Sequence, residues 1–250
     1  MPWDRRAEVE RLLAADDTVL GHTWQYDQDG LTAEQMMEAE GVASPGWIYN
    51  YRSLIRVLRD GEIPTAPSSA QQAARRVRSW LKNKPLSSEL RSALTEQESL
   101  LVSRAEDRSA QAEEVSGAVR ATASAEAAQV PGVYVYTLPH YLRYPFDPST
   151  GRTLLKVGHS AVDAHYRADS QGRLTALPED SILLRIYPSD ASAHVERLFH
   201  GWLRDADHES ARTRRGGSEW FLTSTKFLDR IAQSLGLDIT IVTTYEAGDD

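Results

Sequence analysis

The sequence predicts an α+β protein in which an all-helical N-terminal region precedes a small β-sheet flanked by helices. Apolar residues recur at helical spacing before residue 128, and a single glycine, Gly117, interrupts residues 86–128. The stretch 133–138, directly after Val130-Pro131-Gly132, is rich in β-branched and aromatic residues, as strands are. A chain of 250 residues is long enough for two domains. We therefore expect a helical region (1–85), a long helix or spacer (86–128) and an α+β domain (129–250).

Composition narrows the class of protein. The chain has no cysteine, which excludes disulfide bonds and cysteine-based zinc sites. No apolar run approaches the ~18–20 residues that span a bilayer, and none follows the N-terminal Met-Pro-Trp-Asp-Arg-Arg as in a secretory signal. We therefore expect a cytoplasmic protein with no membrane partner. The net charge of −8 argues against a protein that coats nucleic acid indiscriminately, but it leaves room for a local basic patch.

Two helices and a turn dominate the middle of the N-terminal region. A helix over 33–40 begins at Thr32, a capping residue, and ends at Gly41, which suits the position after a helix. A second helix covers 47–59, after the turn residues Ser44-Pro45-Gly46. This order fits a helix-turn-helix DNA-targeting module with a lengthened turn, and it fits a purely structural αα-hairpin equally well. The other helices expected before residue 85 are 3–15 and 70–81.

A local excess of positive charge lies between Tyr51 and Pro85. Eight basic residues stand there against Asp60 and Glu62, and Trp80 lies among them. Basic residues interleaved with aromatics are typical of surfaces that bind a phosphate backbone, although a solvated helix face gives the same pattern. The candidate nucleic-acid contacts are Arg52, Arg56, Arg75, Arg76, Arg78 and Lys82, together with Arg212, Arg214 and Arg215 of a later loop.

Residues 86–128 are rich in Ala, Glu, Ser, Arg and Gln and form one long helix or two shorter ones. Apolar positions such as Leu90, Leu94 and Leu101 follow a heptad only loosely. An exposed spacer is the simpler interpretation, and a homodimer formed through this segment is the alternative.

The C-terminal region alternates between strand and helix patterns. Residues 192–203 carry a full amphipathic stripe, with apolar residues at i, i+3, i+4, i+7 and i+8 from Val195. The resulting order of elements describes one compact α+β domain. The expected strands are 133–138, 154–158 and 182–187, with a short one within 239–242. Three helices are expected: one begins at Ser160, one begins at Ser192, and the last covers 225–235.

Four short motifs lie on these elements. Gly132-Val133-Tyr134 opens the first strand, Lys156-Val157-Gly158-His159-Ser160 closes the second, Glu196 lies on the amphipathic helix, and Glu219-Trp220-Phe221 comes late. In this order they resemble the GIY-YIG nuclease superfamily, in the branch whose second motif reads Lys-x-Gly-x-Ser/Thr. The resemblance covers about residues 130–224.

The resemblance implies a metal-dependent endonuclease that hydrolyses DNA with Mg²⁺ or Mn²⁺. Tyr134 would orient or deprotonate the attacking water, and Lys156, in place of a second tyrosine, would lower the pKa of Tyr134. His159 would share proton transfer or bind phosphate, which leaves the general base open between Tyr134 and His159. Arg167 would neutralise the scissile phosphate. Glu196 would be the sole protein carboxylate on the metal.

The position of Glu196 agrees with that role on chemical grounds. Mg²⁺ keeps most of its waters and often takes one or two carboxylates, so one glutamate and substrate phosphate oxygens suffice. Glu196 flanks the apolar stripe at about 90° from its centre, and His200 lies one turn further along the same edge. Glu219-Trp220-Phe221 is interpreted as packing. The alternative function is a catalytically inactive nucleic-acid-binding or self-associating regulatory protein on the same fold.

Overall fold

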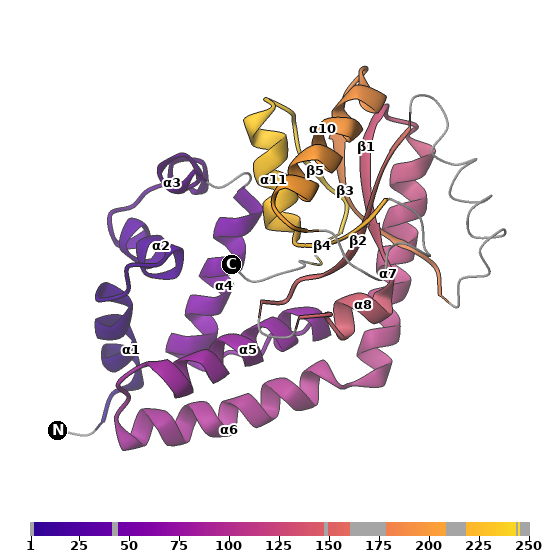
Figure 1. Ribbon diagram of the computed structural model, residues 1–250. Coiled ribbons are helices and arrows are strands. Elements are labelled where there is room, and N and C mark those ends of the chain that lie inside the picture. The colour runs from indigo at the N-terminus through magenta and orange to yellow at the C-terminus, as the bar shows by residue number, and fades with distance from the viewer. Residues whose placement is uncertain are drawn as a thin grey trace. The chain divides into compact units, whose positions relative to one another are not determined.

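The computed structural model describes residues 3–41, 45–147, 150–160, 179–208, 219–243 and 245 (Figure 1). It confirms the α+β class: this part of the chain contains ten helices, mostly N-terminal, and a five-stranded antiparallel sheet at the C-terminal end. The chain divides into two compact units, 1–112 and 113–250. Among the helices described, none combines the length and the apolar character needed to cross a membrane.

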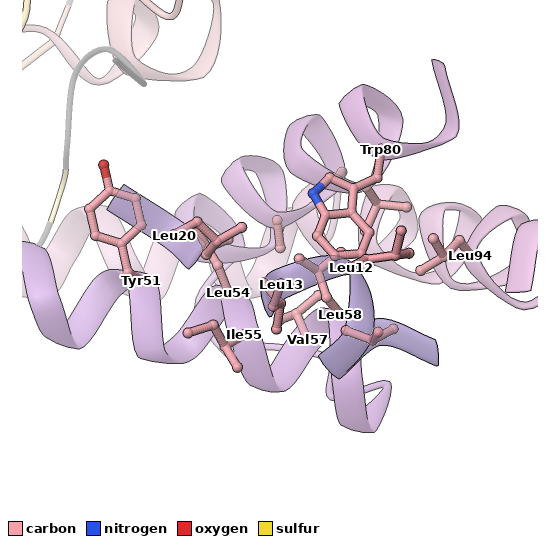
Figure 2. Packing of buried hydrophobic residues seen from close by; sticks show 14 of the residues in the cluster. Leu12, Leu13, Leu20, Tyr51, Leu54, Ile55, Val57, Leu58, Trp80 and Leu94 are labelled. Carbon is pink, nitrogen blue, oxygen red and sulfur yellow. The ribbon is translucent and has the colours of Figure 1, made fainter. Parts of the chain in front are cut away.

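The N-terminal unit is helical throughout its described residues. Its core is built from leucines, isoleucines and valines together with aromatic residues. Figure 2 shows Leu54, Leu13 and Leu12 between Tyr51 at one end of the cluster and Trp80 at the other. The central helix buries Trp47, Leu54 and Leu58 as well as Tyr51. The helices are α1 (Arg5–Ala14), α2 (Val19–Gln28), α3 (Ala33–Glu40), the central α4 (Pro45–Asp60), α5 (Pro67–Asn83) and α6 (Ser88–Ala105).

The helix ends follow the sequence signals. Thr32 and Gln35 form the reciprocal capping box at the start of α3, and Gly41 ends this helix with a left-handed φ of 60°. The pair α3 and α4 therefore has the expected order. Because α4 buries side chains on most of its circumference, only a narrow face of it, which includes Tyr49 and Arg56, is exposed.

Residues 86–128 form two helices, and the first of them is not an exposed spacer. The break falls at Glu106 and Asp107, and the Asp107 carboxylate accepts hydrogen bonds from the backbone N–H groups that open α7 (Arg108–Ala127). Leu90, Leu94 and Leu101 of α6 are fully buried in the N-terminal core. The loose heptad therefore reflects packing within the unit. The later part of α7 belongs to the C-terminal unit.

The sheet of the C-terminal unit has the strand order β4-β2-β1-β3-β5, and all neighbours are antiparallel. The first three predicted strands are confirmed as β1 (Gly132–Thr137), β2 (Thr153–Ser160) and β3 (Ile182–Pro188). The edge strand β4 (Trp220–Thr223) and the short helix α8 (Pro139–Arg143) were not expected. The remaining elements are α10 (Ser192–Asp205), α11 (Thr225–Ser234) and β5 (Thr240–Ile241), while the helix expected after Ser160 lies outside the described residues.

The two faces of the sheet pack against different helices, as Figure 1 shows. Val133 and Val135 of β1 join Phe199 of α10 and residues of α11 in one cluster. Tyr134, which alternates with them along the strand, lies in a second cluster with Ala125 of α7. The sheet is therefore a middle layer, with α10 and α11 on one side and α7 on the other.

A buried ion pair fastens α11 to the sheet. Arg185 of β3 and Asp229 of α11 are both fully buried, and Nε of Arg185 lies 3.3 Å from Oδ2 of Asp229. The hydroxyl of Tyr187 donates to the other oxygen of Asp229 at 2.8 Å. Such a charge is tolerated in a core because it is paired and hydrogen-bonded.

Candidate active site

The first two sequence motifs lie side by side in the sheet. In the register of β1 and β2, Tyr134 is opposite Gly158 and Tyr136 is opposite Lys156. Directly opposite residues of an antiparallel pair present their side chains on the same face. Lys156 therefore shares a face with both tyrosines, and its immediate cross-strand neighbour is Tyr136, not Tyr134.

The outer edge of β2 is paired along only half its length. β4 pairs with β2 from Thr153 to Lys156, and the last bond at this end joins the N–H of Val157 to the carbonyl of Glu219 at 2.8 Å. The carbonyl of Val157 accepts a hydrogen bond from Nε2 of His200, on α10, at 2.9 Å. Helix α10 is thereby held against the edge of β2, next to Gly158.

Glu196 of α10 reaches this edge and binds a histidine. Its Oε2 lies 2.6 Å from Nδ1 of His159, and its Oε1 lies 4.0 Å from Nε2 of His200. The Glu196 side chain is only 13% exposed. A short contact between a carboxylate and an imidazole fixes the ring orientation and places a proton on Nδ1, which leaves Nε2 as the basic nitrogen.

A second carboxylate, that of Glu219 just before β4, faces the same point. A Cβ at Gly158 would lie 3.8 Å from Oε2 of Glu219 and 3.9 Å from Oε1 of Glu196. Oε2 of Glu219 also lies 3.3 Å from Nζ of Lys156. Sequence reasoning missed this role, because Glu219-Trp220-Phe221 was interpreted as packing. The sequence feature that indicates this position is a glutamate directly before a strand that begins with two aromatic residues, Trp220 and Phe221.

Tyr134 has a different environment from the one expected. It is 3% exposed, and its hydroxyl donates a hydrogen bond to the backbone carbonyl of Val130. Burial, with a further contribution from the negative charge of Glu126, raises the pKa of Tyr134 above its ordinary value. Lys156 is not among the groups that shift this pKa, and burial outweighs any lowering. The Lys156 ammonium pairs with the Glu219 carboxylate instead.

The family comparison covers the part of the chain that holds this site. Residues 132–236 match the T5orf172 domain. This domain is nuclease-associated and GIY-YIG-like, as the sequence motifs suggested. The match includes both strands of the site, Glu196 and Glu219. No curated protein and no solved structure shows significant similarity to the chain.

The T5orf172-like domain supplies oxygen donors suited to a hard divalent cation. Among the described residues, no group of three or more His, Asp or Glu side chains is arranged to hold a metal ion. Mg²⁺ does not require such a cage, because it retains waters and binds through one or two carboxylates and the substrate's phosphate. Oε1 of Glu196 faces the point that Glu219 also faces, while its Oε2 is occupied by His159. The residues present therefore fit Mg²⁺ or Mn²⁺.

The basic residues expected to contact nucleic acid are largely paired within the N-terminal unit. Their acidic partners come from other helices and from the loop after α4. A count of the charged residues within 51–85 therefore could not reveal all of these partners. Arg75 and Arg76 also have partners, whereas Lys82 is exposed. Arg167, Arg212, Arg214 and Arg215 lie outside the described residues. The pairs are Arg52–Asp27 at 2.6 Å, Arg56–Glu62 at 3.1 Å and Arg78–Glu98 at 2.5 Å.

Proposed function

We propose that this protein is a metal-dependent endonuclease that hydrolyses phosphodiester bonds of DNA. The proposal rests on one observation: the hydrogen-bonded pair of Glu196 and His159 at the partly free edge of β2, with Glu219 and Lys156 beside it. Hydrolysis needs an activated water and positive charge where the phosphorane forms. Both requirements can be met by groups that meet at Gly158.

We assign the general base to His159 and not to Tyr134. Glu196 orients the imidazole through Nδ1, so Nε2 is the nitrogen that would accept a proton from water. Tyr134 would have to ionise from a buried position in which its hydroxyl is already bound to a carbonyl. We infer that Tyr134 supports the first strand and the wall of the site.

Glu196 would also hold the divalent cation, and the bound cation would supply Lewis-acid stabilisation of the phosphate. Lys156 would place its charge near the substrate while Glu219 keeps the ammonium in position at 3.3 Å. Arg167 would add a second positive charge, as the GIY-YIG resemblance implies. The N-terminal unit would contribute affinity for DNA through cations such as Arg56 and Lys82.

The test is a cleavage assay of the full-length protein on plasmid, linear duplex and single-stranded DNA, with Mg²⁺, Mn²⁺ or EDTA. We expect cleavage that requires the metal and is lost in Glu196→Gln. Asp205→Asn, an exposed acidic residue on the same helix, is the matched control and should keep wild-type activity. Cleavage in EDTA, or in Glu196→Gln at the wild-type rate, would contradict the proposal.

One observation favours the inactive alternative. The tyrosine that the GIY-YIG resemblance makes catalytic is buried and hydrogen-bonded to the backbone. If the protein binds DNA but cleaves none of the substrates with either metal, the fold serves as a nucleic-acid-binding module. The same assay, with binding measured in parallel, separates the two functions.

A further inference from the structure

Exposed aromatic side chains follow the short helix α8. Tyr144 is 62% exposed and Phe146 is 46% exposed, whereas Tyr187, Phe199 and Phe221 of the same unit are buried. Exposed large apolar groups that gather in one place often mark a binding surface. The class of ligand that this surface can bind depends on the residues around Tyr144.

Tyr144 is the outer end of a row of aromatic rings. The centroid of the His140 ring lies 5.2 Å from that of Tyr144 and 6.0 Å from that of Tyr141. Tyr141 in turn meets Trp220 of β4 edge to face, at 6.0 Å and 80°. We call Tyr144, His140, Tyr141 and Trp220 the aromatic row.

The inner end of the aromatic row adjoins the candidate active site. Trp220 is the cross-strand partner of Lys156, and Glu219, the residue before it, receives the Lys156 ammonium. The row is also held in place, because the hydroxyl of Thr153, at the start of β2, donates to the carbonyl of Tyr141 at 2.8 Å. The backbone of α8 is therefore anchored to β2, the strand that carries Lys156.

We propose that the aromatic row stacks unpaired nucleobases, so that the preferred substrate is a single strand or a locally unpaired segment. Every base offers a π-face to an aromatic ring, but bases in a duplex are already stacked on one another. The cations Arg143, at the end of α8, and Arg152, just before β2, suit a phosphate backbone that runs past the row. This inference rests on the proposed function, because it assumes a nucleic-acid substrate.

The test measures binding, not cleavage. The full-length protein carrying Glu196→Gln is titrated, in EDTA, with a fluorescent single-stranded oligonucleotide and with the duplex of the same sequence. Adding Tyr144→Ala should weaken single-strand binding roughly 5- to 100-fold, since one base–aromatic stack is lost. Duplex binding should change less than about twofold, and Tyr144→Phe should restore the single-strand affinity because stacking needs only the ring.

A matched control is Trp3→Ala, which removes an aromatic side chain that is 42% exposed just before α1. It should leave the ratio of single-strand to duplex affinity unchanged. Equal loss of both affinities in Tyr144→Ala, or no loss, would overturn the aromatic row as a base-stacking site. A changed oligomeric state in light scattering with unchanged single-strand affinity would also overturn it and make the row a self-association surface.

These outcomes are distinct from failure of the proposed function. If the Glu196→Gln protein binds neither oligonucleotide, the nucleic-acid substrate itself is wrong and both proposals fall. If it binds both and the wild type cleaves DNA, but Tyr144→Ala has no effect, only the base-stacking inference falls. Thermal unfolding of each variant checks that the exposed substitutions leave the fold intact.

Discussion

Nδ1 of His159 lies 2.6 Å from Oε2 of Glu196, although 37 residues separate them along the chain. His159 lies at the end of β2, and Glu196 lies in the first turns of α10. Their contact places a histidine and a carboxylate at the only stretch of β2 whose outer edge pairs with no strand among the described residues.

His159 and Glu196 should act as one catalytic unit. His159→Gln should lower kcat/KM for DNA cleavage by roughly 10²- to 10⁴-fold, because it removes the base. Glu196→Gln should lower it at least as much. The double variant should be no less active than the less active single variant, because the effects of residues that act as one unit do not add. Losses that multiply would show that the two residues act independently.

The two motif glycines should differ in what they tolerate. A Cβ at Gly132 would lie 2.5 Å from the backbone carbonyl oxygen of Tyr187, so Gly132→Ala should lower the free energy of unfolding by roughly 1–3 kcal/mol. A Cβ at Gly158 meets only carboxylate oxygens, at 3.8 and 3.9 Å. Gly158→Ala should therefore fold normally.

For cleavage activity, we expect Gly158→Ala to be the more damaging of the two substitutions. The methyl group of Gly158→Ala would stand between the carboxylates of Glu196 and Glu219. One misplaced contact there raises the activation free energy by about 1.4 kcal/mol or more, so the cleavage rate should fall at least about tenfold. Urea unfolding and cleavage rates of both variants check the pair. Full activity in Gly158→Ala would show that the space between the two carboxylates is not where the substrate or metal binds.

The buried pair of Arg185 and Asp229 should be strongly coupled. Asp229→Asn removes a carboxylate from beside a buried guanidinium and should destabilise the protein by about 3–5 kcal/mol. Replacing both residues, as Arg185→Met with Asp229→Leu, should cost clearly less than the single change, because the guanidinium is removed together with the carboxylate. Urea unfolding of the two variants measures the difference. A double variant less stable than Asp229→Asn would show that the pair contributes more than charge balance.

His208 should make stability depend on pH. It is buried beside Phe227 and bonded to the hydroxyl of Thr223 at 2.8 Å. Burial, and then the charge of Arg152, lowers the pKa of His208 below its ordinary value near 6.5. Between the folded and the unfolded pKa the unfolded chain binds the extra proton, so stability falls as pH drops below about 6.5 and is constant above it.

The measurement is the urea midpoint between pH 5 and pH 8, for the wild type and for His208→Gln. We expect the wild type to lose more stability than the variant on acidification, even if the variant is less stable at pH 8. Parallel pH profiles would show that another group is responsible.

The ion pair of Arg56 and Glu62 should compete with DNA. Both side chains are exposed, and Nε of Arg56 lies 3.1 Å from Oε2 of Glu62. If Arg56 contacts a phosphate, Arg56→Gln should reduce the slope of log affinity against log salt by about 0.9. Glu62→Gln should instead strengthen binding, because it frees the guanidinium. Unchanged slopes in both variants would remove α4 from the DNA-binding surface.

The sequence was most informative where local signals decide the structure. Thr32 and Gln35 predicted the start of α3 because a capping box needs only two residues three positions apart in one turn. The apolar stripe from Val195 predicted α10, since periodicity reports which face is buried. Strand β4 was missed because Trp220-Phe221-Leu222-Thr223 is too short to show alternation.

Part of the candidate site could be predicted as individual residues, but its geometry could not. The motifs pointed to His159, Lys156 and Glu196, and the structure brings all three to the edge of β2 near Gly158. Nothing along the chain indicated that Lys156 would pair with Glu219, or that the hydroxyl of Tyr134 would bind the carbonyl of Val130. Such partners are set by strand register and by which helix covers each face.

By itself, then, the sequence determined the α+β class, the strands β1 to β3, most of the helices, and three of the residues that meet near Gly158, namely Lys156, His159 and Glu196. The tertiary structure alone decided how charges and hydroxyls are paired. It neutralised Arg52 with Asp27, buried Tyr134 so that its pKa rises, and set Glu219 opposite Glu196. The physical reason is that helix caps and apolar periodicity act over a few residues, whereas desolvation and ion pairing depend on groups that only folding brings together.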